Sequence, residues 1–67
     1  MTGVVKAVVA DRGFGFITSD VGGRDFFFHH AALELPLTFE SLTGGERVIF
    51  DTQQAERGPR AVRIRPA

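Results

Sequence analysis

Two short aromatic segments, residues 12–17 (RGFGFI) and residues 25–30 (DFFFHH), constrain the fold more than any other feature of this sequence. If each segment is a strand, alternate side chains share a face. The rings cannot all be buried, because a chain of 67 residues builds only one small core. We therefore expect one set of rings to fill the interior and the other to form an exposed row. Such rows stack the bases of single-stranded nucleic acid.

Gly15 indicates which rings face inward. It lies between Phe14 and Phe16, and a glycine inside a strand usually marks a close backbone approach or a sharp bend. A strongly coiled barrel strand supplies that reason, so we expect Gly15 to face the interior. The alternative is that Phe14 and Phe16 form the core and Gly15 faces solvent. Phe26 and Phe28 already supply a bulky inner face, which favours the first interpretation.

The rest of the sequence predicts five short strands and no substantial helix. We expect the strands at residues 4–10, 14–19, 26–29, 47–52 and 60–65. Gly22-Gly23 marks a hairpin turn, and residues 31–45 form the longest connection, with one helical or 3₁₀ turn at its start. These elements predict an all-β fold, a five-stranded antiparallel OB-fold barrel formed by the single domain 1–67, because closure removes unpaired strand edges.

For the last two strands the sequence also predicts which residues face inward, and it predicts a loop between them. Both strands alternate apolar with polar residues, which is typical of half-buried strands. Residues 53–59 are expected to form a loop. The residues expected on the inner face are Val48, Phe50, Thr52, Val62 and Ile64.

Composition narrows the class of protein. The chain has no cysteine, so no disulfide or thiolate metal site stabilises it. No apolar run reaches the length of a membrane span, and no signal-peptide core is present. We therefore expect a cytoplasmic protein with no membrane partner and no cofactor. Eight Lys and Arg balance eight Asp and Glu, so the net charge lacks the basic excess of many nucleic-acid-binding domains, although four arginines cluster after residue 56.

Neither catalysis nor metal binding is expected. Ser19 and Ser41 have no evident base-and-orienter arrangement, and residues 13–16 lack the Lys-Ser/Thr pair and the helix of a phosphate-binding loop. His29 and His30 point to opposite faces if the strand continues through them, so they share an ion only if it ends there. We expect His29 to stack or hydrogen-bond at the aromatic face, with an ordinary surface position as the alternative.

The order and spacing of these motifs resemble the cold-shock domain family over almost the whole chain. Residues 3–6 resemble the family's opening strand, and residues 12–17 and 25–29 resemble its two RNA-binding motifs. Residues 39–50 resemble its third loop and fourth strand, and residues 58–61 resemble the entry to its last strand. The segments occur in order at the family's spacings, which makes the resemblance specific.

The resemblance implies a barrel that binds single-stranded RNA or DNA, as an RNA chaperone or a regulator of gene expression. Exposed rings would stack successive bases, cationic side chains would meet phosphates or base edges, and Asp25 would hydrogen-bond a base edge. The expected nucleic-acid-binding residues are Lys6, Arg12, Phe14, Phe16, Asp25, Phe27, His29, His30, Phe39, Arg57, Pro59 and Arg60.

The chain departs from the family pattern in its first strand. The family typically has Trp-Phe-Asn where this chain has Ala7-Val8-Val9, and His30 occupies a position that is usually aromatic. Base stacking contributes about 1–3 kcal/mol per base, so we expect one subsite to be weaker by about one to two orders of magnitude. Stacking on His30 is expected to recover part of that loss.

An alternative function is a protein-interaction barrel that uses the same exposed rings, including self-association. The neutral net charge and the missing first-strand rings favour this alternative. We expect a monomer, with a homodimer as the alternative. Binding that weakens with added salt would indicate nucleic acid as the partner.

Overall fold

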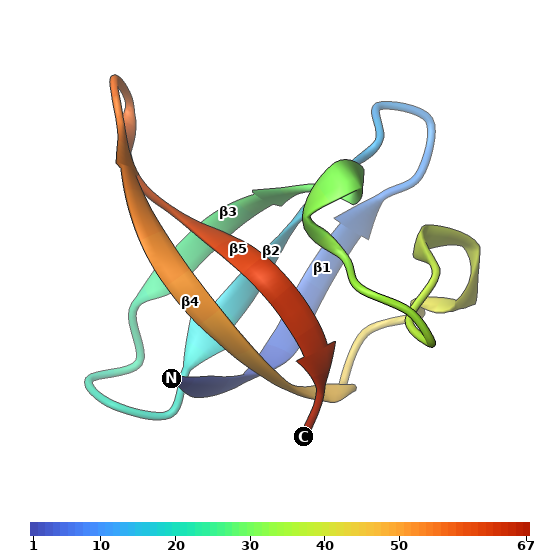
Figure 1. Cartoon of the computed structure of the whole chain (residues 1–67), viewed down its shortest axis with the longest axis horizontal. Coiled ribbons are helices and arrows are strands. Elements are labelled where there is room, and N and C mark those ends of the chain that lie inside the picture. The colour runs from blue at the N-terminus through green and yellow to red at the C-terminus, as the bar shows by residue number, and fades with distance from the viewer.

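Five strands in the order β1-β2-β3-β5-β4 close into a barrel in the computed structural model, which describes all 67 residues (Figure 1). The predicted strands are all present, and β4 and β5 extend further because their hairpin turns only at residues 56–57. Most of the segment expected to be a loop is therefore paired strand. The elements are β1 Thr2–Val9, β2 Phe14–Ser19, β3 Asp25–His29, η1 His30–Ala32, η2 Phe39–Ser41, β4 Arg47–Ala55 and β5 Gly58–Pro66, where η marks a 3₁₀ turn.

The expectation of a purely antiparallel barrel is wrong for one pair of strands. Four neighbouring pairs are antiparallel, whereas β3 and β5 run parallel, with Phe27 opposite Arg60. An odd number of strands cannot alternate in direction around a closed barrel, so at least one neighbouring pair must be parallel. The prediction of a five-stranded all-β barrel is otherwise confirmed.

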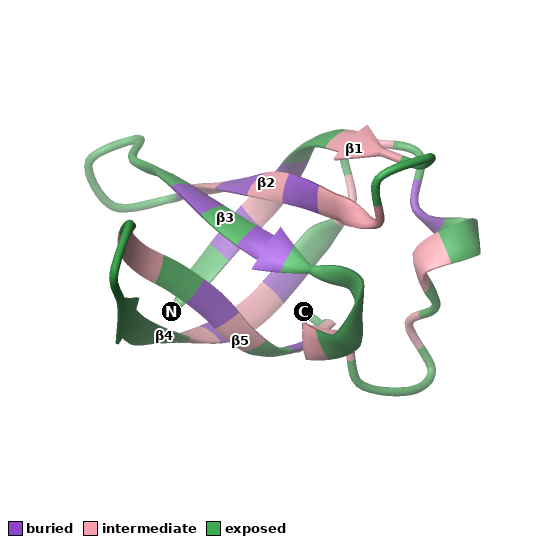
Figure 2. Cartoon of the chain, turned by 90° about the horizontal axis from the view of Figure 1, so that it is seen from above, coloured by how far each residue is buried: buried purple, intermediate pink, exposed green.

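The two sets of phenylalanines separate by strand face as predicted. Phe26 and Phe28 are 4% and 0% exposed, and they point into the barrel. Phe14 and Phe16 are half-buried on the outer face, and Phe27 is exposed there. Figure 2 shows the resulting alternation of buried and more exposed positions along β2 and β3. The interpretation that placed Phe14 and Phe16 in the core is therefore wrong.

Gly15 faces the interior, as predicted, because there is no room for a side chain at that position. A Cβ atom on Gly15 would lie 2.5 Å from the carbonyl oxygen of Ala7 and 2.8 Å from the Phe28 ring. The backbone of β2 at Gly15 therefore packs closely against β1 and against Phe28, one of three phenylalanines in the core. This close approach is the physical reason for a glycine inside a strand.

The expected inner faces of β4 and β5 are each wrong at one residue. Val48 and Phe50 are buried as predicted, but Thr52 is exposed on the outer part of β4 that forms the hairpin with β5. In β5, Ala61 and Ile64 are buried and Val62 is only half-buried. The pairing of β4 with β5 shifts between Ile49 and Asp51, and Arg63 has a positive φ of 49°. This bulge breaks the strict alternation that the sequence suggested.

The core lies inside the barrel, and the long connection between β3 and β4 packs against it. Leu33 forms a bridge with Ile64, and Leu37 and Phe39 are partly buried against the core. Both helical segments are 3₁₀ turns of three residues, and neither has the length or apolar character to cross a membrane. The buried apolar residues are Val5, Ile17, Phe26, Phe28, Leu42, Val48, Phe50, Ala61 and Ile64.

Candidate functional site

A continuous row of paired residues crosses the outer surface of all five strands. Ala7 on β1 lies opposite Phe16 on β2, and Phe16 lies opposite Phe27 on β3. Phe27 lies opposite Arg60 on β5, and Arg60 lies opposite Gln53 on β4. All five side chains are exposed or half-buried. We call these five residues the cross-barrel row, and two of its members are aromatic.

The row reaches Ala7 because β1 contains a bulge. Val5 lies opposite Ile17 and Ala7 lies opposite Phe16, so β1 has one extra residue, Lys6, between these pairs. As a result Lys6 and Ala7 are both exposed, whereas Val5 is buried. Ala7 therefore occupies an outer position beside Phe16 but offers no ring.

Three of the predicted stacking residues, Phe14, Phe16 and Phe27, are in mutual contact on the outer face. The ring centroids are 6.0 Å apart for Phe14 and Phe16, 5.3 Å for Phe14 and Phe27, and 6.1 Å for Phe16 and Phe27. We call these residues the phenylalanine triad. Phe27 is 37% exposed, so its ring is accessible from the surface.

A second group of rings, His29, His30 and Phe39, lies at the end of β3. The ring centroids of His29 and His30 are 4.2 Å apart, and those of His30 and Phe39 are 6.0 Å apart. We call this the histidine group. The two histidines do not point to opposite faces, because β3 ends at His29 and the chain turns into η1, which is the exception that the sequence left open.

Local hydrogen bonds hold the histidine group in place. Nδ1 of His29 accepts a hydrogen bond of 3.2 Å from the backbone N–H of Ala31, which caps η1. The backbone N–H of His30 donates to the carbonyl oxygen of Gly13 at 2.9 Å. A Cβ atom on Gly13 would lie 2.8 Å from the His30 ring, so a glycine there lets the β1–β2 turn pack against that ring.

Lys6 and Asp25 form an ion pair of 2.7 Å between Nζ and Oδ2. Asp25 also accepts a hydrogen bond of 2.8 Å from the hydroxyl group of Thr18, its neighbour across β2 and β3. Hydrogen bonds from Lys6 and Thr18 hold the pKa of Asp25 below its ordinary value. These two predicted ligand residues are therefore brought together, and each partly neutralises the other.

The arginines of the predicted site are free of such partners. The structure contains three ion pairs, formed by Lys6 with Asp25, Arg47 with Asp20 and Arg63 with Asp51. None of them includes Arg12, Arg57 or Arg60. Arg12 is exposed in the β1–β2 turn, where its side chain makes no hydrogen bond.

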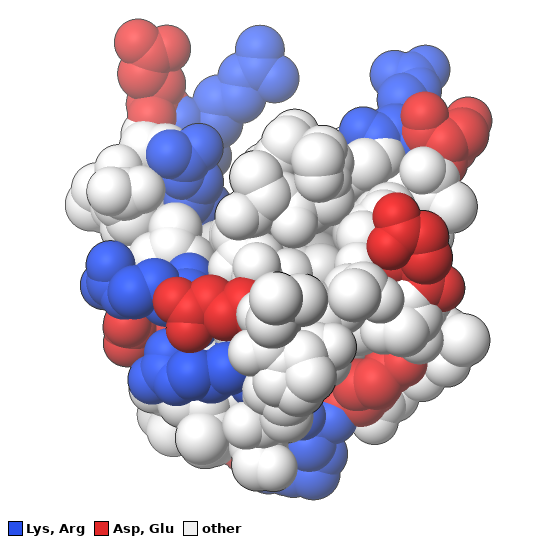
Figure 3. All heavy atoms as spheres, turned by 45° about the vertical axis from the view of Figure 1, so that its right-hand side comes forward, with Lys and Arg blue, Asp and Glu red and all other residues white.

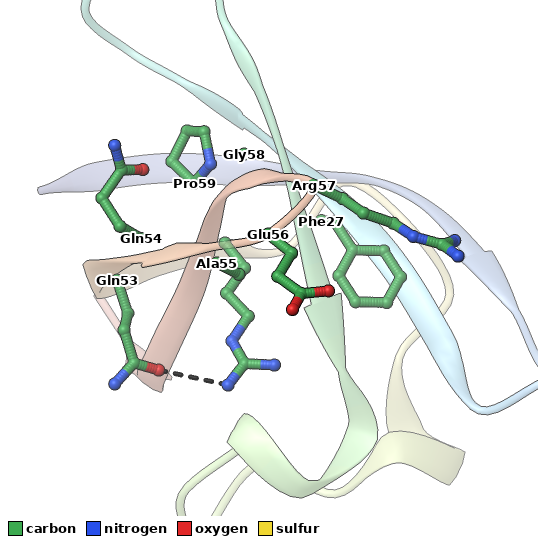
Figure 4. A pocket seen from close by; sticks show the side chains of 9 residues that line it. Phe27, Gln53, Gln54, Ala55, Glu56, Arg57, Gly58 and Pro59 are labelled. Atoms are coloured by element: carbon green, nitrogen blue, oxygen red, sulfur yellow. Dashed lines mark hydrogen bonds between the residues drawn. The ribbon is translucent and has the colours of Figure 1, made fainter.

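A cavity of about 670 Å³ lies between Phe27 and the β4–β5 hairpin, lined by Phe27 and residues 53–60 (Figure 4). We call it the hairpin pocket. It brings together three of the predicted residues besides Phe27, namely Arg57, Pro59 and Arg60. A smaller cavity of about 260 Å³ lies beside η1 and shares Arg60 with the hairpin pocket. Arg60 therefore lies between the two hollows.

Sequence reasoning missed Gln53, which it placed in a loop. Gln53 ends the cross-barrel row, and its side-chain oxygen accepts a hydrogen bond of 3.2 Å from Nη2 of Arg60. The signal was weak, because residues 51–55 are mostly polar and lack the apolar alternation of a half-buried strand.

The chain has as many acidic as basic residues, eight of each. On the surface seen in Figure 3, acidic and basic side chains are interspersed around an uncharged central area. The net charge is zero because the two signs balance, and side chains of both signs lie on this face. No three His, Cys, Asp or Glu side chains are grouped as ligands for a metal ion.

The chain as a whole is similar to known proteins. Residues 1–67 match the family described as the 'Cold-shock' DNA-binding domain. The chain is 44% identical to the cold shock-like protein CspG of Escherichia coli (strain K12), over 96% of this chain and 90% of that protein. It is 42% identical to cold shock protein 2 of Lactiplantibacillus plantarum, over 96% and 94%, and 43% identical to the cold shock-like protein CspA of Bordetella pertussis, over 94% and 92%.

Proposed function

The chain belongs to the cold-shock domain family, whose domains bind nucleic acid, and we propose that it binds single-stranded RNA or DNA by stacking bases on its exposed rings. The observation that carries this proposal is the phenylalanine triad on the outer face of β2 and β3. Its rings are too exposed to serve mainly as core, and flat exposed rings are the surfaces on which single-stranded bases stack.

The geometry supports a path for the strand across two groups of rings. Bases would stack first on the phenylalanine triad and then on the histidine group, where β3 ends. Arg12 and Arg57 carry unpaired charges and would meet phosphates. Lys6 and Asp25 would contribute after exchanging their mutual ion pair for contacts with the ligand.

A base whose face is stacked on a protein ring cannot at the same time stack within a double helix, which gives the proposed binding a consequence for RNA. Occupied base faces keep the strand from forming hairpins, so the protein would act as an RNA chaperone without hydrolysing a nucleotide. Stacking tolerates any base, because every base has a π-face. The proposal therefore assigns a broad preference for unpaired strands and requires no cofactor.

The test is a titration of fluorescently labelled heptathymidine and heptauridine with the protein at about 50 mM and 200 mM salt. A label is needed because the chain has no Trp or Tyr to report binding. We expect saturable binding that weakens with salt, and much weaker binding of the matching duplex, whose base faces are covered.

Absence of binding at tens of micromolar protein and low salt would contradict the proposal. If the mass measured by light scattering then rose with protein concentration, the exposed rings would instead serve self-association.

A further inference from the structure

The cross-barrel row does not end with its aromatic members. Beyond Phe27 it continues to Arg60 and then to Gln53, so a guanidinium and an amide follow the rings on the same outer surface. Arg60 lies opposite Phe27 in the parallel register of β3 and β5. A base stacked on Phe27 would therefore present one of its edges to Arg60.

Arg60 is oriented by a neutral partner. Its Nη2 donates a hydrogen bond of 3.2 Å to the side-chain oxygen of Gln53, drawn as the dashed line in Figure 4. A guanidinium has five N–H donors, and Arg60 takes part in no ion pair. Gln53 thus holds the side chain in place without neutralising its charge, and most of its donors remain available to a ligand.

The chemistry of this arrangement favours one base. A guanidinium fork matches the two adjacent acceptors O6 and N7 of guanine, whereas adenine presents a donor, its N6 amine, in place of O6. Glu56 lines the same hairpin pocket and projects from the hairpin beside Phe27 in Figure 4. Its carboxylate can accept hydrogen bonds from the N1–H and N2 amine of guanine. Guanine is the only common base with both an adjacent acceptor pair and an adjacent donor pair.

We propose that the hairpin pocket selects guanine at the nucleotide stacked on Phe27, with Arg60 as the specificity-determining residue. This inference rests on the proposed function, because it assumes that a base stacks on Phe27. It adds a local sequence preference to a surface that otherwise tolerates any base.

The experiment compares heptathymidine with seven variants that each carry one guanine, binding to the wild type, Arg60→Gln and Arg57→Gln. We expect guanine at one position to tighten wild-type binding by about 5- to 150-fold, the range of a bidentate base contact. Arg60→Gln should lose this gain. Arg57→Gln removes the same charge from the same hairpin, so it should weaken binding of every oligonucleotide while keeping the preference for guanine.

A single-atom change in the ligand sharpens the test. Replacing the favoured guanine by 7-deazaguanine removes the N7 acceptor and leaves the other atoms of the base edge unchanged, so most of the gain should disappear with the wild type. The inference is wrong if guanine gives no gain at any position, or if the gain survives Arg60→Gln or 7-deazaguanine. Heptathymidine binding without a guanine preference overturns only this inference, whereas no binding of any oligonucleotide overturns the proposed function as well.

Discussion

At the scale of single residues, strand parity separates the rings that stabilise the barrel from those available to a ligand. The double substitution Phe16→Ala/Phe27→Ala removes two outer rings that contact each other at 6.1 Å between centroids. We expect a loss of affinity for heptathymidine of about 1–3 kcal/mol per ring. Thermal stability should fall by less than in a core truncation, because Phe16 is half-buried and Phe27 is exposed, and an aromatic contact adds only about 0.5–1.5 kcal/mol beyond the buried area. Fluorescence anisotropy and thermal unfolding measure the two effects.

Phe28→Ala is the matched control for those two substitutions. Phe28 is 0% exposed, and truncating a buried phenylalanine costs about 3–5 kcal/mol. This variant should therefore lose much of its folding stability. If Phe16→Ala/Phe27→Ala were destabilised as strongly as Phe28→Ala, the outer rings would belong to the core and the proposed stacking surface would be wrong.

Ala7 is the residue at which the stacking surface is incomplete. It is exposed and lies opposite Phe16, so Ala7→Trp should add a ring to the cross-barrel row. We expect tighter binding of heptathymidine by about 1–3 kcal/mol. Val21→Trp is the control, since Val21 is 75% exposed in the β2–β3 turn, away from the row. It supplies the same fluorophore, so an equal gain in both variants would show that tryptophan binds non-specifically.

Single residues also mark the limits of prediction from the sequence. The inner and outer phenylalanines were predictable, because Gly15 leaves only one face of β2 able to carry large rings. The contact between the His29 and His30 rings was not predictable from alternation, because it depends on β3 ending at His29. The position of Gln53 depends on how far β4 and β5 remain paired, and polar residues give no periodic signal of that.

At the scale of elements, the packing of β2 against its neighbours leaves no room for a methyl group at position 15. A Cβ atom there would lie 2.5 Å from a backbone oxygen and 2.8 Å from the Phe28 ring. We expect Gly15→Ala to lower the free energy of unfolding by about 1–3 kcal/mol, as overpacking usually does. Chemical denaturation followed by circular dichroism measures this change.

A double-mutant cycle with Phe28→Leu tests whether the clash is the cause. A smaller side chain at position 28 relieves the contact with the ring, so the double variant should be more stable than the sum of the single effects predicts. Coupling of about 0.5–3 kcal/mol is typical of residues in contact. Simple additivity would mean that Gly15 is needed for a reason other than the approach of Phe28.

The parallel pair of strands could be predicted in part from the sequence, whereas the bulge in β5 could not. That one pair of strands is parallel follows from counting strands in a closed barrel, whereas the identity of that pair, β3 with β5, is given by the structure. The bulge in β5 does not follow from the sequence, because it places an arginine at φ 49°, a conformation that glycine and asparagine favour. Arg63 also forms an ion pair of 2.7 Å with Asp51, a contact between strands that local sequence does not reveal.

At the scale of the whole molecule, four carboxylates have lowered pKa values, and three of them, Asp20, Asp25 and Asp51, link separate strands of the barrel. The first cause is a side-chain hydrogen bond from Thr2 for Asp20, from Lys6 for Asp25 and from Arg63 for Asp51, and a backbone hydrogen bond from Thr43 for Glu46. A pKa lowered by folding stabilises the native state above the unfolded pKa, which is about 4 for these groups. That stability is lost as the pH falls through the lowered native values.

We therefore expect the thermal midpoint to fall as the pH decreases below about 4. Glu46 accepts hydrogen bonds from the backbone N–H groups of Thr43 and Gly44, both at 2.8 Å. Glu46→Gln should lower the midpoint near neutral pH and should converge with the wild type in acid. Glu34→Gln is the control, because the Glu34 side chain accepts no hydrogen bond. A Glu46→Gln effect that is independent of pH would contradict this account.

The net charge of the chain is zero, so attraction to a polyanion must come from a local excess of positive charge. Arg12, Arg57 and Arg60 form no ion pairs, whereas Lys6 is paired with Asp25. The local charge on the proposed interface is therefore positive even though acidic and basic residues balance over the molecule. Counterion release depends on the phosphates that are contacted, so Arg12 and Arg57, the two arginines proposed to meet phosphates, would set the salt dependence.

If Arg12 and Arg57 each meet one phosphate, the logarithm of the binding constant for heptathymidine should fall with the logarithm of the salt concentration with a slope of about −1.4. Arg57→Gln should make the slope shallower by about 0.7. Arg47→Gln is the control, because Arg47 begins β4 at the end opposite the hairpin and is paired with Asp20 at 2.7 Å, so the slope should not change. A wild-type slope near zero would mean that stacking alone drives binding, and equal slopes for both variants would place the phosphates elsewhere on the barrel.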